Sequence, residues 1–403
     1  MTSSFLLDDH PLHPLDRELT KIEPNGRAQM HAGWKKRFSE APLLLQDSFI
    51  ADAPLVASSA LMQELDAHTH ALCRELAPLL TKPADDEWAS TPAADALALD
   101  FAIVQSEPGA ARPWTLRCVE FQAFASIAAT NRLVAEHAAE VWPQLRDLAE
   151  HDGPTSDWLA RMKLWVAPGT HNVLVERDPW GQKTAFDFQA LERLTSIKVV
   201  DDRQLRLRNQ VLQLNHEQSG AVAVDHILNR LVLHTAPDAD QQLLASARVS
   251  WHSHPRWYYR ISKALMPGLN LPQANRCVLA DDWRSLGVPA ERLVLKATHS
   301  FGGADVHLHV TGAQLDALEH PRDWLVQPRF TPLPIRQASD GAPIFGELRC
   351  MVALMPGQRP WVASRIARLY RGDKASSSTF SSLGCGLAAV LSAPGHTWGA
   401  SSC

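Results

Sequence analysis

The segment from Glu291 to Val306, ERLVLKATHSFGGADV, constrains the fold more than any other part of the chain. Its apolar run Leu293–Leu295 predicts a short buried strand, and the residues Ser300–Gly303 predict a glycine turn after it. Lys296 ends the strand. A lysine neutralises phosphate oxygens, and paired glycines let backbone N–H groups approach them. The spacing is not that of a Walker loop. The segment therefore predicts either a nucleotide-phosphate site or an ordinary strand and turn with a solvated lysine.

Residues 97 to 126 are typical of two strands joined by a loop rich in glycine, proline and alanine. Strict alternation in the second strand predicts that four side chains share one side: Leu116, Cys118, Glu120 and Gln122. Asp100 interrupts an apolar run in the first strand, and a hairpin would bring it beside Glu120. Carboxylate and amide oxygens are ligands that magnesium takes when it also holds phosphates. The same pattern also fits an exposed edge hairpin with solvated acids.

A second lysine precedes Lys296 by one short segment. Ser262–Leu269 combines a polar cap, Lys263 and a helix that a proline stops. Two lysines on neighbouring elements would hold the phosphates of a nucleotide from two directions. Further on, residues 324–329 predict a strand that leads into a hinge.

Three arginines follow in two predicted strands, 346–352 and 361–369. These candidate catalytic residues are Arg349, Arg365 and Arg368. Gathered around a charged transition state, guanidinium groups would serve as planar, bidentate donors. Taken one at a time, each also fits a solvated surface arginine.

Composition excludes several classes of protein. With 403 residues the chain is long enough for two or three packed units, and 45% hydrophobic with 21% charged residues is ordinary for a globular protein. The net charge of −5 and the absence of lysine-arginine runs exclude a nucleic-acid or membrane-surface partner. The N-terminus lacks a basic leader and no apolar segment approaches a membrane span, so we expect a cytoplasmic protein. The six scattered cysteines indicate neither a disulfide framework nor a zinc site.

The order of these motifs resembles the circularly permuted ATP-grasp enzymes of the glutathionylspermidine synthase type. The resemblance spans residues 97 to 370 and is carried by Asp100, Glu120-Phe121-Gln122-Ala123, Ser262–Pro267, Leu295-Lys296 with Gly302-Gly303, and Leu325-Val326-Gln327. It implies ATP and Mg²⁺ as cofactors. It implies magnesium ligands at Asp100, Glu120 and Gln122, and ATP contacts at Lys263, Lys296, Ser300, Gly302, Gly303 and Gln327.

This resemblance also implies an α+β architecture, a permuted ATP-grasp fold with a small α/β pre-ATP-grasp domain. We expect a helical segment and the metal-binding hairpin in residues 1–150, the small domain in 151–245, and the nucleotide-binding lobes in 246–403. The chain departs from the family at Ala98, where the family has an arginine, and at Gln122, where it has an asparagine.

The implied reaction is that of an ATP-dependent ligase. ATP phosphorylates a small-molecule carboxylate, such as an amino acid or peptide, and an amine or thiol then attacks the acyl phosphate. A small-molecule kinase that stops after phosphoryl transfer is one alternative. A non-catalytic ATP-binding regulatory protein is another, since Ala98 removes a family arginine.

Overall fold

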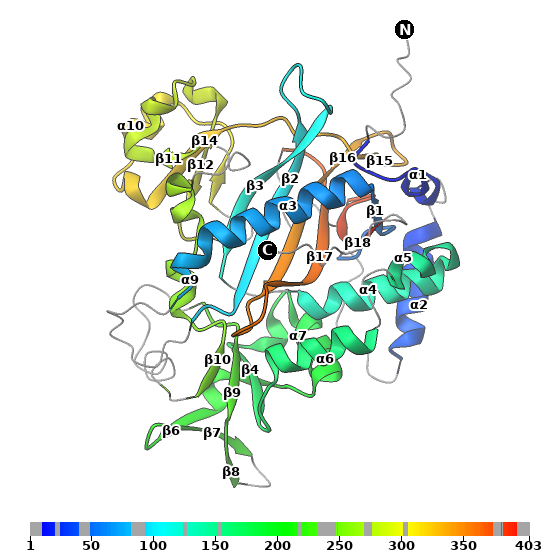
Figure 1. Cartoon of the computed structure of the whole chain (residues 1–403), viewed down its shortest axis with the longest axis vertical. Coiled ribbons are helices and arrows are strands. Elements are labelled where there is room, and N and C mark those ends of the chain that lie inside the picture. Colours follow the sequence, from blue (N-terminus) through cyan, green and yellow to red (C-terminus); the bar gives the residue numbers. More distant parts are fainter. Residues whose placement is uncertain are drawn as a thin grey trace.

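A computed structural model describes residues 10–20, 25–39, 49–81, 93–123, 127–150, 155–216, 220–232, 247, 249–269, 276–300, 305–373, 380 and 382–392. Within them the fold mixes helices with several separate sheets (Figure 1). The helices are α1 (Pro14–Thr20), α2 (Asn25–Arg37), α3 (Ser59–Leu76), α4 (Ala128–Val141), α5 (Arg146–Glu150), α6 (Thr155–Val166), α7 (Ala185–Thr195), α9 (Arg256–Arg260) and α10 (Gly312–Asp316). In the described part of the chain, none of them combines the length and apolar character that crossing a membrane requires.

The largest sheet combines strands from the N-terminal part of the chain with strands from its C-terminal part. Its strands lie in the order β1-β18-β17-β16-β2-β3, and β15 also pairs with β16. They are β1 (Leu55–Ala57), β2 (Ala96–Gln105), β3 (Trp114–Gln122), β15 (Arg336–Gln337), β16 (Pro343–Ala353), β17 (Trp361–Tyr370) and β18 (Gly386–Ser392). The predicted hairpin is confirmed as β2 and β3, and β2 pairs antiparallel with β16 from the far end of the sequence.

Helix α3 covers one face of this central sheet (Figure 1). The Ser58 side chain caps the helix by accepting a hydrogen bond from the N–H of Leu61 at 3.2 Å. Its leucines recur at helical spacing and are all buried: Leu61, Leu65, Leu72 and Leu76. They pack on the odd-numbered residues of β2, such as Leu99 and Phe101. The spacing of these leucines in the sequence is that of an amphipathic helix.

The opposite face is covered by helices along only part of its length. Side chains of α2, α4, α6 and α7 pack there on Ala96 and Ala98 of β2 and on Met351 of β16. Further along β2 the even-numbered positions on this face are Asp100, Ala102 and Val104, and the last two belong to a small separate apolar cluster. On this half of the face Phe330 packs on that cluster, whereas helices cover the other half.

A second sheet, of four parallel strands, lies beside the start of β2. Its order is β10-β9-β4-β5, formed by β4 (Asn172–Glu176), β5 (Lys198–Asp201), β9 (His226–Asn229) and β10 (Ser250–His252). Asp95 joins it to the central sheet, accepting from the N–H of Ser253 at 2.9 Å and pairing with His252 at 2.7 Å. Strand β10 lies beyond residue 245, where we expected this unit to end.

Two smaller sheets complete the fold. One is the meander of β6 (Leu205–Arg208), β7 (Val211–His216) and β8 (Gly220–Ala223). The other is antiparallel in the order β11-β14-β12-β13, formed by β11 (Val278–Leu279), β12 (Leu293–Ala297), β13 (Val306–His307) and β14 (Trp324–Pro328). Strand β12 is the strand predicted before the glycine turn.

Candidate functional site

A β-bulge in β3 turns Glu120 toward the face of the central sheet on which Phe330 packs. Asp100 lies opposite Glu120 and Phe101 lies opposite Cys118, so Val119 is the extra residue. A bulge of this kind shifts the alternation of side chains by one position and re-aims those that follow.

The bulge corrects one sequence prediction and leaves another intact. Leu116 and Cys118 face the core beneath α3, and beyond the bulge Phe121 takes that direction. The prediction that Leu116 and Cys118 share a side with Glu120 is therefore wrong, because strict alternation stops at Val119. The pairing of Asp100 with Glu120 is as the hairpin predicted.

Two lysines from distant segments meet this bulge. The Lys296 ammonium donates to the Val119 carbonyl at 3.1 Å, although the two residues are 177 positions apart. Burial lowers the pKa of Lys296, and the nearby Glu120 carboxylate opposes that change. The Lys263 ammonium lies 3.6 Å from Glu120 Oε1. It also donates to Ser300, to the carbonyl at 2.6 Å and to Oγ at 3.0 Å.

Local structure fixes the direction of Lys263. Ser262 accepts a hydrogen bond from the N–H of Ala264 at 3.3 Å and caps a short 3-10 helix, Lys263–Gly268. The predicted polar cap is confirmed, whereas Pro267 lies inside the helix and does not end it.

A buried network of charges lies next to the lysines. Asp100, only 1% exposed, accepts from Arg349 at 2.6 and 2.7 Å and from Arg368 at 2.6 Å. Arg368 also donates to Glu347 at 2.6 Å. Burial acts to raise the pKa of Asp100, but the two arginines outweigh it and hold that pKa below its ordinary value. Burial raises the pKa of Glu347, and the Asp100 carboxylate adds to the increase against the effect of Arg368.

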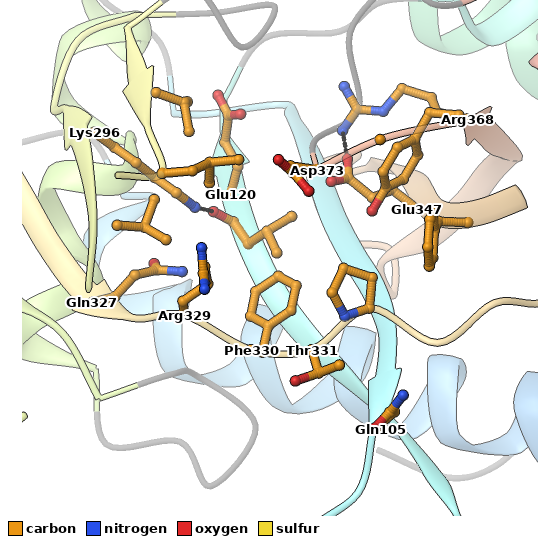
Figure 2. Close-up of a pocket in the computed structure, with 18 of the residues that line it drawn as sticks. Gln105, Glu120, Lys296, Gln327, Arg329, Phe330, Thr331, Glu347, Arg368 and Asp373 are labelled. Atoms are coloured by element: carbon orange, nitrogen blue, oxygen red, sulfur yellow. Dashed lines mark hydrogen bonds and ion pairs between the residues drawn. The ribbon is translucent and has the colours of Figure 1, made fainter. Parts of the chain in front are cut away.

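These groups surround a cavity of about 620 Å³ between the central sheet and the β11–β14 sheet (Figure 2). Its polar side chains include Glu120, Lys263, Lys296, Gln327, Glu347 and Arg368. Its apolar lining includes Val294, Val306, Leu308, Phe330, Phe345 and Tyr370. The size and the few convergent polar groups are those of a small-molecule site.

Gln327 is the most unusual residue of the lining. Its side chain is 1% exposed, and among the described residues neither its amide nitrogen nor its amide oxygen has a hydrogen-bond partner. Leaving a buried amide unsatisfied costs free energy, which a ligand with complementary groups would recover.

Apart from Arg365, the predicted site residues fall into three groups. Glu120, Lys263, Lys296, Gln327 and Arg368 line the cavity. Ser300 contacts Lys263, Asp100 contacts Arg368 and Arg349 contacts Asp100, but none of the three lines the cavity. Gln122 is half-buried opposite Ala98 and is not part of the lining, while Gly302 and Gly303 lie outside the described residues.

The grouping of Arg365 with the other two arginines is wrong. Arg365 and Arg368 are three residues apart in β17, so their side chains point to opposite faces of the sheet. Arg365 is buried against α3, where it donates to Asp66 Oδ1 at 2.9 Å. It therefore stabilises the helical face and does not reach the cavity.

The carboxylates of the cavity fit a divalent cation that also contacts phosphates. Glu120 and Glu347 both line it, and the charge of Glu120 contributes to the raised pKa of Glu347, so a cation between them would relieve repulsion. Both Asp100 oxygens already accept from arginines. No group of three His, Cys, Asp or Glu side chains is arranged to hold a metal in the described ranges. Phosphate oxygens would have to complete the ligand shell.

Glu347 was not among the predicted site residues, although the sequence carried a signal for it. Alternation in β16 puts Glu347 on the face of Arg349, two residues later. An acid two residues from an arginine on the same face of a strand is a candidate for the same cluster.

Comparison with known proteins supports the fold. No protein-family model and no curated protein sequence matches the chain. Among solved structures, it is similar to a glutathione synthetase-like effector from Globodera pallida in its apo form, with a TM-score of 0.57. The similarity covers 93% of this chain and 99% of that one at 11% identity.

The chain shares the mixed α+β fold of that protein, which is consistent with an ATP-grasp-like fold. An identity of 11% carries the fold alone and no substrate or reaction. The circular permutation, the pre-ATP-grasp domain and the closer likeness to glutathionylspermidine synthase stay predictions.

Proposed function

We propose that the cavity binds ATP with Mg²⁺ and that the protein is an ATP-dependent ligase joining a small carboxylate to an amine or a thiol through an acyl phosphate. The observation that carries the proposal is the convergence of Lys263 and Lys296 on the bulge at Glu120 in one cavity. Neither the segment of Lys263 nor that of Lys296, taken alone, requires the two lysines to lie at the same carboxylate. Two cations at a carboxylate-lined cavity suit a nucleotide with its metal.

Each residue has a distinct role in this proposal. Lys263 and Lys296 neutralise the phosphates. Glu120 and Glu347 would hold the magnesium ion, which would neutralise the charge that develops on the phosphate oxygens. Arg368 donates to the transferring phosphoryl group, because it is the one of the three predicted catalytic arginines that lines the cavity. Asp100 and Arg349 position Arg368 from behind. Asp100 and Gln122 as metal ligands stay predictions.

The proposed chemistry has two steps. A carboxylate oxygen of the substrate attacks the γ-phosphorus of ATP, and the bond from that phosphorus to the β-γ bridging oxygen breaks to release ADP. The amine or thiol then attacks the acyl carbon, and phosphate leaves with the electron pair of the broken C–O bond. Positioning and charge stabilisation supply most of the acceleration in reactions of this type.

A non-catalytic ATP-binding protein is a second candidate, and Ala98 favours it. Ala98 is 2% exposed and packs among the side chains of the helices on that face. Residue 98 therefore supplies no charge to the substrate, whereas the family that the chain resembles has an arginine at this position.

Alanine variants of both lysines test the ATP site. Lys263→Ala and Lys296→Ala should each weaken ATP binding about tenfold or more, because each removes a charge-assisted contact on the order of 1.5–3 kcal/mol. Isothermal titration with ATP and Mg²⁺ measures this. Lys163→Ala, which alters an exposed lysine of α6, is the control. Variants that bind ATP as tightly as the parent would remove the basis of the proposal.

A screen for stimulated phosphate release separates the ligase from the binder. Amino acids, short peptides and polyamines are added with ATP and Mg²⁺, and ADP and phosphate are measured. A ligase releases phosphate faster with its substrates, and Glu120→Gln should abolish the stimulation. ATP binding without any release across the screen would favour the second candidate.

A further inference from the structure

The position of Lys296 in its strand locates the end of the cavity where a nucleotide base would lie. Val294 precedes Lys296 by two residues, about 7 Å along β12, and Gln327 of β14 lies directly opposite Val294. With phosphates at Lys296, the base belongs near Val294 and Gln327. This placement rests on the proposed function.

Two apolar walls of different origin enclose that end. Val294 and Val306 come from the β11–β14 sheet, whereas Phe330 packs on Val119 of the central sheet and lies beside Arg329 (Figure 2). A flat aromatic ring fits between such walls, and its identity is then decided by the polar groups at its edge.

Gln327 is the first of those polar groups. A carboxamide carries a donor and an acceptor, and rotation by half a turn exchanges them. Adenine and guanine present opposite donor and acceptor patterns on the Watson–Crick edge, so Gln327 alone accommodates either base. Its buried amide atoms have no partner among the described residues.

Arg329 is the second polar group at the edge of the base. It follows Gln327 by two residues and lines the same cavity (Figure 2). Its side chain is exposed, and no contact of the guanidinium group with another described residue is present. Its backbone N–H donates to the Arg292 carbonyl at 2.8 Å, which anchors this residue to the end of β14.

A guanidinium group distinguishes guanine from adenine, which the Gln327 amide does not. It carries donors only, and it pairs bidentately with O6 and N7 of guanine, whereas adenine presents an amino donor at the position of O6. We infer that Gln327 and Arg329 together read the purine edge, and that the cavity binds guanine nucleotides about as well as adenine nucleotides.

The test compares the dissociation constants of ATP and GTP, each with Mg²⁺, on the full chain. In the parent, GTP should bind within about tenfold of ATP. Arg329→Ala should weaken GTP about tenfold and ATP less than about threefold, since one bidentate base contact is worth about 1–3 kcal/mol. Arg208→Ala, at an exposed arginine of β6, should change neither constant.

Arg329→Lys separates base reading from simple attraction of the phosphates. Lysine keeps the charge without the planar fork, so the ratio of the two constants should shift as in Arg329→Ala. A charge effect would instead weaken both nucleotides equally in Arg329→Ala and leave the ratio unchanged. Should Arg329→Ala not fold, Arg329→Gln takes its place.

Either of two results would overturn the inference: a parent that binds GTP more than tenfold more weakly than ATP, or a ratio that Arg329 variants do not change. A parent that binds neither nucleotide would refute the proposed function itself, so the two failures are distinguishable.

Discussion

At the scale of single residues, Asp100 is the most constrained group in the site. It is buried and holds two arginines that come from two strands of the central sheet. Removing one partner of a buried ion pair is costly because the other charges stay buried without compensation. Asp100 thus supports the fold as well as the direction of Arg368.

Asp100→Asn should therefore lower the free energy of unfolding by about 3–5 kcal/mol near pH 7. The folded-state pKa of Asp100 lies below its ordinary value, so its contribution is present above the unfolded pKa of about 3.9 and is lost as pH falls through the folded pKa. Urea denaturation of both proteins at pH 7 and below pH 4 measures this. A difference between parent and variant that does not shrink in acid would contradict the assignment.

Glu120 has a different balance of roles. It is the half-buried cavity carboxylate that lies 3.6 Å from Lys263. Glu120→Gln keeps the shape and removes the charge, so it should lower magnesium-dependent turnover strongly while the melting temperature changes little. Glu107→Gln, at an exposed acid of the β2–β3 loop, is the control. Full magnesium-dependent activity in Glu120→Gln would remove Glu120 from the metal site.

At the scale of elements, strand β17 separates two tasks by its faces. Arg368 faces the cavity, and Arg365 faces α3 and binds Asp66. Substituting Arg365 should thus affect packing alone.

Arg365→Met should lower the free energy of unfolding by about 3 kcal/mol, because Asp66 loses its buried partner. It should leave the ATP dissociation constant unchanged within about twofold. Urea denaturation and ATP titration on the same preparation give both quantities. Weaker ATP binding with unchanged stability would place Arg365 back in the site.

At the scale of the whole molecule, the cavity lies between two sheets whose strands come from segments far apart in the sequence. A ligand there contacts both sheets only when the protein is folded, so binding stabilises the folded state. With ATP at about a hundred times its dissociation constant and Mg²⁺ present, we expect about 2.7 kcal/mol of added stability. Thermal unfolding with and without ATP measures it, and Lys296→Ala should show a smaller increase at the same ATP concentration.

The sequence by itself determined the local elements. Alternation identified the β2–β3 hairpin, the apolar run before Lys296 identified β12, and the polar cap at Ser262 identified the short helix that begins at Lys263. It also brought Asp100 opposite Glu120, because hairpin pairing is a short-range property of the chain.

Only the tertiary structure decided which of the predicted residues meet. The bulge at Val119 and the separation of Arg365 from Arg368 depend on register and strand parity, and a single extra residue reverses either one. The meeting of Lys263 and Lys296 with Glu120 depends on how whole sheets pack. Contacts across 177 residues arise from buried surfaces of the entire chain, and no local pattern of residue types encodes them.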